Sequence, residues 1–238
     1  MAEPIKISEL TPDQIKQAEG FLTAQKKWNE HFTKKSAPTE FEKQYYKKVY
    51  SATAEPEPII YEDLRDMFWS KAKQLCPDYK VHEPGTYREI TNYFLNPEKD
   101  KGILIAGGTG SGKTQFFKIM QISLLNLRLP AYRIVSCIDV EQAIRSEQAQ
   151  YSDFAFGDMC FDDLGTESAE TVIYGNRVNV MSEIIQIRYN AFHNKGIKTH
   201  YTTNLAPDEI EKRYGTRVSD RLKEVCTTYI FDWDSFRK

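Results

Sequence analysis

The stretch that decides the fold reads Gly107-Gly108-Thr109-Gly110-Ser111-Gly112-Lys113-Thr114. An apolar run at residues 102–106 precedes it and predicts a strand, and a helix-favouring run follows from residue 113. Glycines here let the backbone curl so that successive N–H groups point at one anion. In this setting Lys113 reaches the β- and γ-phosphates of a nucleotide, and the Thr114 hydroxyl ligates Mg²⁺. The stretch therefore predicts that all eight residues contact ATP, and it disfavours a glycine-rich turn without a ligand.

Strands and helices alternate on either side of this loop. Further strands are predicted at residues 133–136, 159–161, 198–203 and 227–231, and helices at residues 113–127, 139–146 and 177–194. Such alternation predicts a parallel sheet with helices on both faces. We expect a three-layer α/β fold whose central parallel sheet has five strands.

Polar side chains follow two of these predicted strands. Asp162 and Asp163 come directly after the apolar residues 159–161, and Asn204 follows residues 198–203. Asp162 is the candidate Mg²⁺ ligand, and Asp163 is the candidate group that orients or deprotonates the attacking water. Asn204 could hydrogen-bond that water or the γ-phosphate. Each could be an ordinary turn residue in isolation, but the loop upstream favours the catalytic interpretation.

Two arginines lie four residues apart on a short predicted helix. Arg217 and Arg221 share one face of that helix. An arginine can offer planar positive charge to a phosphoryl transition state, in its own subunit or in a neighbour's. The alternative is a salt-bridged surface helix, and the residues leave open which arginine has which role.

Residues 1–76 differ in composition from residues 77–238, and we divide the chain into two domains at this point. Prolines interrupt polar, helix-favouring stretches in the first part, including helices predicted at about residues 11–33 and 40–50. Residues 21–50 hold seven lysines and three glutamates among several aromatic side chains. These stripes could bind single-stranded nucleic acid. We favour a protein partner, because aromatic faces at helical spacing more often pack against protein.

Composition excludes several other classes of protein. A net charge of −2 over 238 residues shows no overall basic excess of the kind that marks many DNA-binding domains. The four cysteines are too far apart in sequence for a structural zinc site or a redox pair. No apolar run is long enough to cross a bilayer, and the polar N-terminus is unlike a signal peptide. We therefore expect a cytoplasmic protein.

The motifs together resemble the AAA+ ATPases of the DnaC and IstB group, over about residues 79–238. Besides the loop, the resemblance rests on Asp162-Asp163-Leu164-Gly165-Thr166-Glu167, Tyr174-Gly175-Asn176, Arg188-Tyr189, Thr202-Thr203-Asn204-Leu205, Tyr214-Gly215 with Arg217 and Arg221, and Trp233-Asp234-Ser235-Phe236-Arg237. It implies the strand order 5-1-4-3-2 and a reduced or absent C-terminal lid.

The resemblance also implies a function. It makes the chain an Mg²⁺-dependent ATPase that works between subunits of an oligomer, with Arg221 as the first candidate finger, Arg217 as the second, and Arg237 as a nucleotide-sensing arginine. In DnaC-like proteins the N-terminal segment binds the replicative helicase, and the ATPase domain touches single-stranded DNA. We therefore expect a helicase loader. The alternatives are an IstB-like transposition helper, a P-loop small-molecule kinase, and a nucleotide-binding scaffold without turnover.

Overall fold

The computed structural model describes residues 59–79, 84–96, 101–173, 175–232 and 235. The two helices predicted within the first 58 residues, and Arg237, lie outside this part of the chain. All five strands predicted for the central sheet, and the glycine loop, lie inside it.

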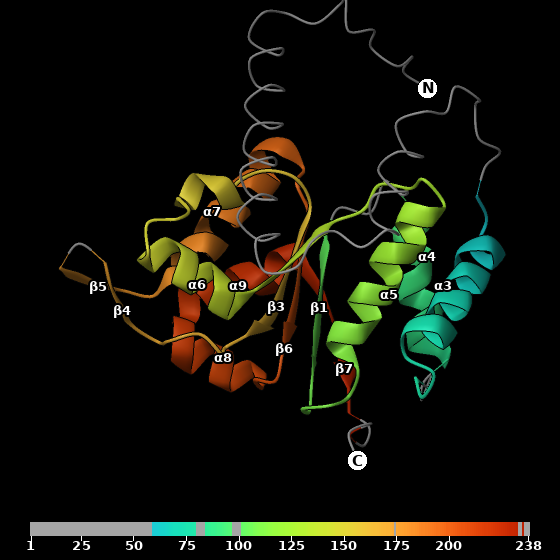
Figure 1. Ribbon diagram of the computed structural model, residues 1–238. Helices are drawn as coiled ribbons and strands as arrows, with labels where there is room; N and C mark the ends of the chain where they lie inside the picture. The colour runs from blue at the N-terminus through green and yellow to red at the C-terminus, as the bar shows by residue number, and fades with distance from the viewer. Residues whose placement is uncertain (1–58, 80–83, 97–100, 174, 233–234, 236–238) are drawn as a thin grey trace, which may run out of the picture. The chain divides into compact units, whose positions relative to one another are not determined.

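The centre of the fold is a five-stranded parallel sheet (Figure 1). Its strands are β1 (Gly102–Gly107), β2 (Arg133–Ser136), β3 (Met159–Leu164), β6 (Thr199–Thr203) and β7 (Cys226–Phe231). They lie in the order β2-β3-β6-β1-β7, and every neighbouring pair is parallel. Counted along the chain this order is 5-1-4-3-2 read from the β7 edge, so both the five-stranded sheet and its expected order are confirmed.

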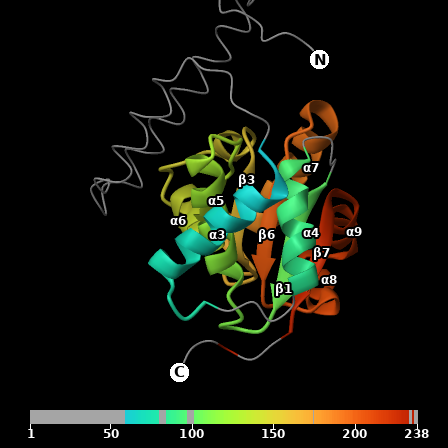
Figure 2. The same cartoon turned by 90° about the vertical axis from the view of Figure 1, so that its right-hand side faces the viewer.

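Helices cover both faces of the sheet. On one face lie α3 (Tyr61–Leu75), α4 (Pro84–Leu95) and α5 (Lys113–Asn126), which stand in front of the strands in Figure 2. On the other lie α6 (Cys137–Arg145), α7 (Val180–Lys195) and α9 (Thr216–Val225), with α8 (Pro207–Tyr214) beside them (Figure 1). The three-layer prediction is confirmed. None of the described helices is long and apolar enough to span a membrane.

The segment between β3 and α7 differs from the prediction. The helix expected from Arg177 begins at Val180, because residues before it form an antiparallel hairpin of β4 (Thr171–Ile173) and β5 (Asn176–Val178). Asn179 caps the helix, and its side-chain oxygen accepts a hydrogen bond from the Ser182 N–H at 2.8 Å. Outside this segment, a short 3₁₀ helix before β3 (Tyr151–Phe154) and helix α8 after β6 were also not predicted.

Helix α3 lies before the boundary predicted at residue 76, yet it packs into the core of the sheet domain. Its Leu64, Phe68 and Ala72 are buried. The Phe68 ring lies 5.5 Å from that of Phe116 on α5, the helix that follows the glycine loop. The division of the chain near residue 76 stays a prediction, and the packing of α3 favours an earlier boundary.

One ionisable group of the sheet interior is held neutral. His200 on β6 is buried among aromatic rings, and its Nδ1 accepts a hydrogen bond from the Ile103 N–H of β1 at 3.1 Å. Burial, with smaller contributions from Lys198 and Arg188, lowers the pKa of His200 to about 3. The imidazole is therefore uncharged at neutral pH and serves as an acceptor that joins β1 to β6.

The cysteines are free thiols, as expected. Cys137, Cys160 and Cys226 are buried, and Cys76 is half-buried. Burial, followed by the nearby Glu167, Asp162 and Asp163, raises the pKa of Cys137 well above its usual range. Its thiol therefore stays protonated beside the acidic residues of the site.

Candidate nucleotide-binding site

The glycine loop joins β1 to α5, as the motif requires. Gly107 has φ +147°, and a Cβ atom there would lie 2.1 Å from the Phe231 carbonyl oxygen of β7. Gly112 has φ +91° in the left-handed region and forms the N-cap of α5. Only glycine fits these two positions, because one needs close backbone approach and the other a positive φ. The first N–H groups of α5 have no partner inside the helix and face the loop.

Lys113 is buried at the base of this loop. Its Nζ donates hydrogen bonds to the carbonyl oxygens of Gly107 at 2.7 Å and Gly108 at 2.8 Å, and to Asn204 Oδ1 at 2.7 Å. The side chain is thus fixed between the loop and the end of β6. A buried ammonium group at this place is well suited to bind a phosphate oxygen.

Two threonine hydroxyl groups hold Asp162, the first of the two acids. Thr114 Oγ1 donates to Asp162 Oδ1 at 2.9 Å, and Thr202 Oγ1 donates to the same oxygen at 2.7 Å. Asp162 is 9% exposed. The α5 hydroxyl and the β3 carboxylate predicted to share Mg²⁺ are therefore neighbours.

The second acid lies at an irregularity of β3. Asp163 has φ +57°, and the pairing of β3 with β6 shifts register between Phe161 and Leu164. The Asp163 N–H donates to Thr202 Oγ1 at 2.7 Å. Adjacent residues of a regular strand point to opposite faces, and a bulge changes this alternation. The Thr202 hydroxyl therefore holds both acids, because it donates to the side chain of Asp162 and accepts from the backbone N–H of Asp163.

These residues fit Mg²⁺ and a nucleotide. Mg²⁺ is usually bound by one or two protein oxygens together with phosphate oxygens and water, and Thr114 with Asp162 supplies two such oxygens. Within the described residues no group of three or more His, Cys, Asp or Glu side chains could hold a metal by itself.

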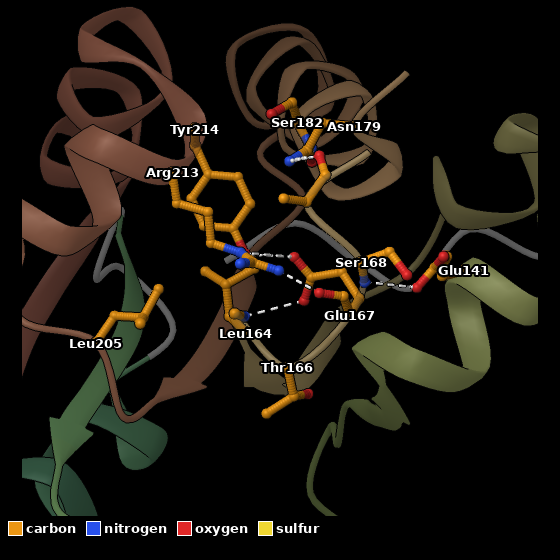
Figure 3. Close-up of polar contacts among 12 residues, drawn as sticks. Glu141, Leu164, Thr166, Glu167, Ser168, Asn179, Ser182, Leu205, Arg213 and Tyr214 are labelled. Atoms are coloured by element: carbon orange, nitrogen blue, oxygen red, sulfur yellow. Dashed lines mark hydrogen bonds and ion pairs between the residues drawn. The ribbon is translucent and has the colours of Figure 1, made fainter. Parts of the chain in front are cut away.

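After Asp163 the chain makes a tight turn that ends at Glu167 (Figure 3). Glu167 is buried, and its carboxylate contacts the turn itself and the end of α8. Just beyond it, Glu141 of α6 accepts hydrogen bonds from the Ser168 N–H at 2.7 Å and from the Thr171 hydroxyl. Burial on its own would raise the pKa of Glu141, but these hydrogen bonds hold that pKa below its ordinary value. Two carboxylates therefore fasten the segment that leads from β3 to the hairpin.

The structure does not bring the candidate finger arginines to this loop. Arg217 is exposed on α9. The Arg221 guanidinium lies 4.7 Å from the ring centroid of Tyr189 on α7, whose hydroxyl donates to Glu224 Oε2 at 3.0 Å. Within the described residues no hydrogen bond or ion pair joins either arginine to the glycine loop.

Arg188, another residue of the resemblance, is fixed inside the molecule. It is 1% exposed, and its guanidinium donates to Thr199 Oγ1 at 2.7 Å and to the carbonyl oxygens of Phe154, Gly157 and Lys198. It joins β6 to the 3₁₀ helix and cannot reach another subunit.

The sequence interpretation missed two residues of this region. Thr202 was not among the predicted site residues, although a threonine two positions before Asn204 in a buried strand was a usable signal. Glu167 was part of the resemblance but had no assigned role. Its importance depends on a contact with Tyr214, which lies 47 residues away in sequence.

No protein-family model matches the sequence, and no curated protein matches it significantly. Several solved structures are similar to this chain. A proposed primosome component from Streptococcus pyogenes serotype M3 has a TM-score of 0.54 at 15% identity, over 68% of this chain and 87% of that chain. The DnaC helicase loader has a TM-score of 0.50 at 17% identity, over 68% of this chain and 97% of that chain. DnaI has a TM-score of 0.50 at 19% identity, over 72% of this chain and 94% of that chain. The chain therefore shares the fold of these proteins, which confirms the three-layer α/β fold expected from the sequence.

Proposed function

We propose that this chain is an Mg²⁺-dependent ATPase that loads a replicative helicase onto single-stranded DNA. The observation that carries the proposal is the meeting of Lys113, Thr114, Asp162 and Asn204 at one edge of the sheet, through contacts of 2.7 to 2.9 Å. The helicase-loading part rests on the fold shared with the DnaC helicase loader.

Each residue has a proposed role in hydrolysis. The N–H groups of residues 107–114 and the Lys113 ammonium bind the β- and γ-phosphates. Thr114 and Asp162 hold Mg²⁺, which supplies positive charge to the phosphate oxygens. Asp163 orients the attacking water and accepts its proton, and Asn204 hydrogen-bonds the water or the γ-phosphate.

The remaining roles lie at other sites. We propose that Arg221, or Arg217 in its place, offers charge to the transition state in a neighbouring subunit of an oligomer, and that Arg237 contacts the nucleotide. The N-terminal segment, residues 1–76, binds the helicase. These assignments rest on the resemblance and, for Arg217, on its exposure on α9.

The test is ATP hydrolysis by the purified full chain with no DNA, with an oligo-dT strand, and with a duplex of equal length. We expect slow turnover that rises with the single strand. Stimulation by duplex alone would favour a transposition helper, and failure to bind ATP would overturn the proposal. Addition of the replicative helicase of the same replication system should yield a complex by gel filtration. Because α3 packs into the core of the sheet domain, the control removes only the first compact unit, residues 1–54, and residues 55–238 alone should not form the complex.

A further inference from the structure

The carboxylate of Glu167 joins the turn at the end of β3, beside the proposed nucleotide site, to α8, which precedes the helix with the candidate finger arginines. Its side chain is 0% exposed. One oxygen, Oε2, accepts a hydrogen bond from the Gly165 N–H at 2.9 Å, and the other, Oε1, accepts one from the Tyr214 hydroxyl at 2.5 Å (Figure 3). A single side chain thus connects the turn after β3 with the last residue of α8.

On the side of the nucleotide site, Glu167 closes the turn that carries Asp163. Both the N–H and the hydroxyl of Thr166 donate to the Asp163 carbonyl oxygen, at 3.1 and 2.7 Å. Gly165 has φ +104° and packs against Leu205, since a Cβ atom there would lie 2.6 Å from a Leu205 methyl group. Leu205 directly follows Asn204. The turn therefore begins at Asp163 and contacts Leu205, the neighbour of Asn204. Asp163 and Asn204 are the two residues proposed to bind the attacking water.

On the other side, Glu167 holds the end of α8. Besides the Tyr214 hydroxyl, the Arg213 Nε lies 3.5 Å from Glu167 Oε1, and the Arg213 guanidinium donates to the Glu167 backbone carbonyl. Burial, with the nearby Glu167, raises the pKa of Tyr214, so its hydroxyl keeps the proton that it donates. The end of α8 cannot move far without breaking these contacts.

Helix α8 continues almost directly into the helix that carries the candidate fingers. Only Gly215 separates Tyr214, the last residue of α8, from Thr216, the first residue of α9. The Thr216 hydroxyl donates to Glu211 Oε1 at 2.9 Å, and the Ser219 N–H donates to the Gly215 carbonyl at 3.1 Å. Because these bonds tie the two helices together, a displacement of Tyr214 is passed on to Arg217 in the first turn of α9.

We propose that Glu167 is a positioning residue that couples the state of the nucleotide site to α8 and α9, and so sets the presentation of the finger arginines to the next subunit. The inference rests on the proposed function, because it assumes that nucleotide binds at residues 107–114. A change at Asp163 on binding moves the turn of residues 163–167, and the two bonds of the carboxylate carry that movement to α8. Such coupling requires that both ends be held at once.

The competing explanation is that Glu167 only stabilises the fold, and the chain offers a matched control. Glu141 belongs to α6 and accepts two hydrogen bonds from the same segment, at Ser168 and Thr171, rather than from α8. Glu141→Gln therefore disturbs the segment to a similar degree without touching the proposed coupling.

Two variants break the coupling in different ways. In Glu167→Gln the amide oxygen can still accept from the Gly165 N–H, but the NH₂ group then faces the Tyr214 hydroxyl, which must accept instead of donate. The charge-assisted bond to α8 becomes a weaker neutral one, and the ion pair with Arg213 is lost. Tyr214→Phe removes a single hydroxyl and keeps the ring packing. It therefore tests the proposal even if Glu167→Gln folds poorly.

The experiment is amide hydrogen exchange of the full chain with and without Mg²⁺ and a non-hydrolysable ATP analogue. In the wild type we expect the analogue to protect residues 107–116 and to change exchange across residues 211–222. Tyr214→Phe and Glu167→Gln should keep the protection of the loop but lose roughly half or more of the response of α8 and α9. In steady-state hydrolysis they should lower kcat about tenfold with KM within about twofold of wild type. Glu141→Gln should keep both responses.

The outcomes separate this inference from the proposed function. If the analogue does not protect the loop in the wild type, both the proposed function and this inference are overturned. A protected loop with an unchanged α8–α9 response in both variants, or an equal loss in Glu141→Gln, would leave nucleotide binding intact and overturn the role of Glu167.

Discussion

The two parts of the proposed active site differ in how far one chain completes them. At the loop, Lys113, Thr114, Asp162 and Asn204 are already joined by short hydrogen bonds within the described chain. On α9, Arg217 is exposed and Arg221 stacks on Tyr189, without contact with the loop. The proposed phosphate-binding half is therefore preorganised within one chain, whereas the proposed finger half would act on a second subunit. Nucleotide binding and hydrolysis should for this reason respond differently to mutation.

The largest effect is expected at Lys113. Lys113→Ala removes the buried ammonium that contacts the loop and Asn204, so we expect turnover to fall on the order of 10³-fold, with weaker nucleotide binding. Phosphate release and equilibrium binding of a fluorescent ATP analogue would measure the two effects. Lys118→Ala, on an exposed position of the same helix, is the matched control. Equal loss in both variants would contradict the assignment.

The next effect concerns the framework under the loop. His200 has a pKa of about 3 when folded, against 6.5 for the unperturbed group. Below pH 6.5 the unfolded chain takes up a proton that the folded chain does not, so stability falls as the pH is lowered. Through this residue alone, the free energy of unfolding should fall by roughly 2 kcal/mol between pH 7 and pH 5. Denaturant unfolding at the two pH values would measure it.

The control for this prediction is His200→Gln, which keeps an acceptor for the Ile103 N–H but does not titrate. The variant should be less stable at pH 7 and lose less stability on acidification than the wild type. An identical loss in both proteins would show that other groups cause the pH dependence.

A smaller effect is expected at Thr202. Thr202→Val removes the hydroxyl that bonds both Asp162 and the Asp163 N–H, so we expect kcat to fall about tenfold and the Mg²⁺ concentration for half-maximal activity to rise several-fold. Mg²⁺ titrations of hydrolysis would measure this. Thr203→Val is the control, because that hydroxyl donates to the Leu164 carbonyl and accepts from the Leu205 N–H, and its hydrogen bonds do not include Asp162. A Mg²⁺ dependence equal to wild type would remove Thr202 from the metal site.

The same two regions show what could be predicted from the sequence. The loop, the five strands and the acids at the end of β3 were predictable, because glycines, apolar strands and strand-end carboxylates leave local patterns. The strand order came from the resemblance and not from such patterns. The hairpin of β4 and β5 was not, since Arg177 fits a helix pattern and only its pairing with Val172 overrides it. The roles of Glu167 and Thr202 were not predicted, because their hydrogen-bond partners lie far away in sequence. The two candidate finger arginines were found as a pattern, and their proposed use in a neighbouring subunit stays a prediction.

The central claim is that hydrolysis is completed between subunits, and mixing two inactive variants tests it most directly. Asp163→Asn keeps the loop and Arg221 but lacks the group proposed to manage the water, and Arg221→Ala keeps a complete loop but lacks the finger. If the finger acts in a neighbour, an equal mixture should recover about a quarter of wild-type turnover, since random head-to-tail assembly pairs the needed residues at one interface in four. Turnover of the mixture equal to the average of the two inactive parents would contradict the claim.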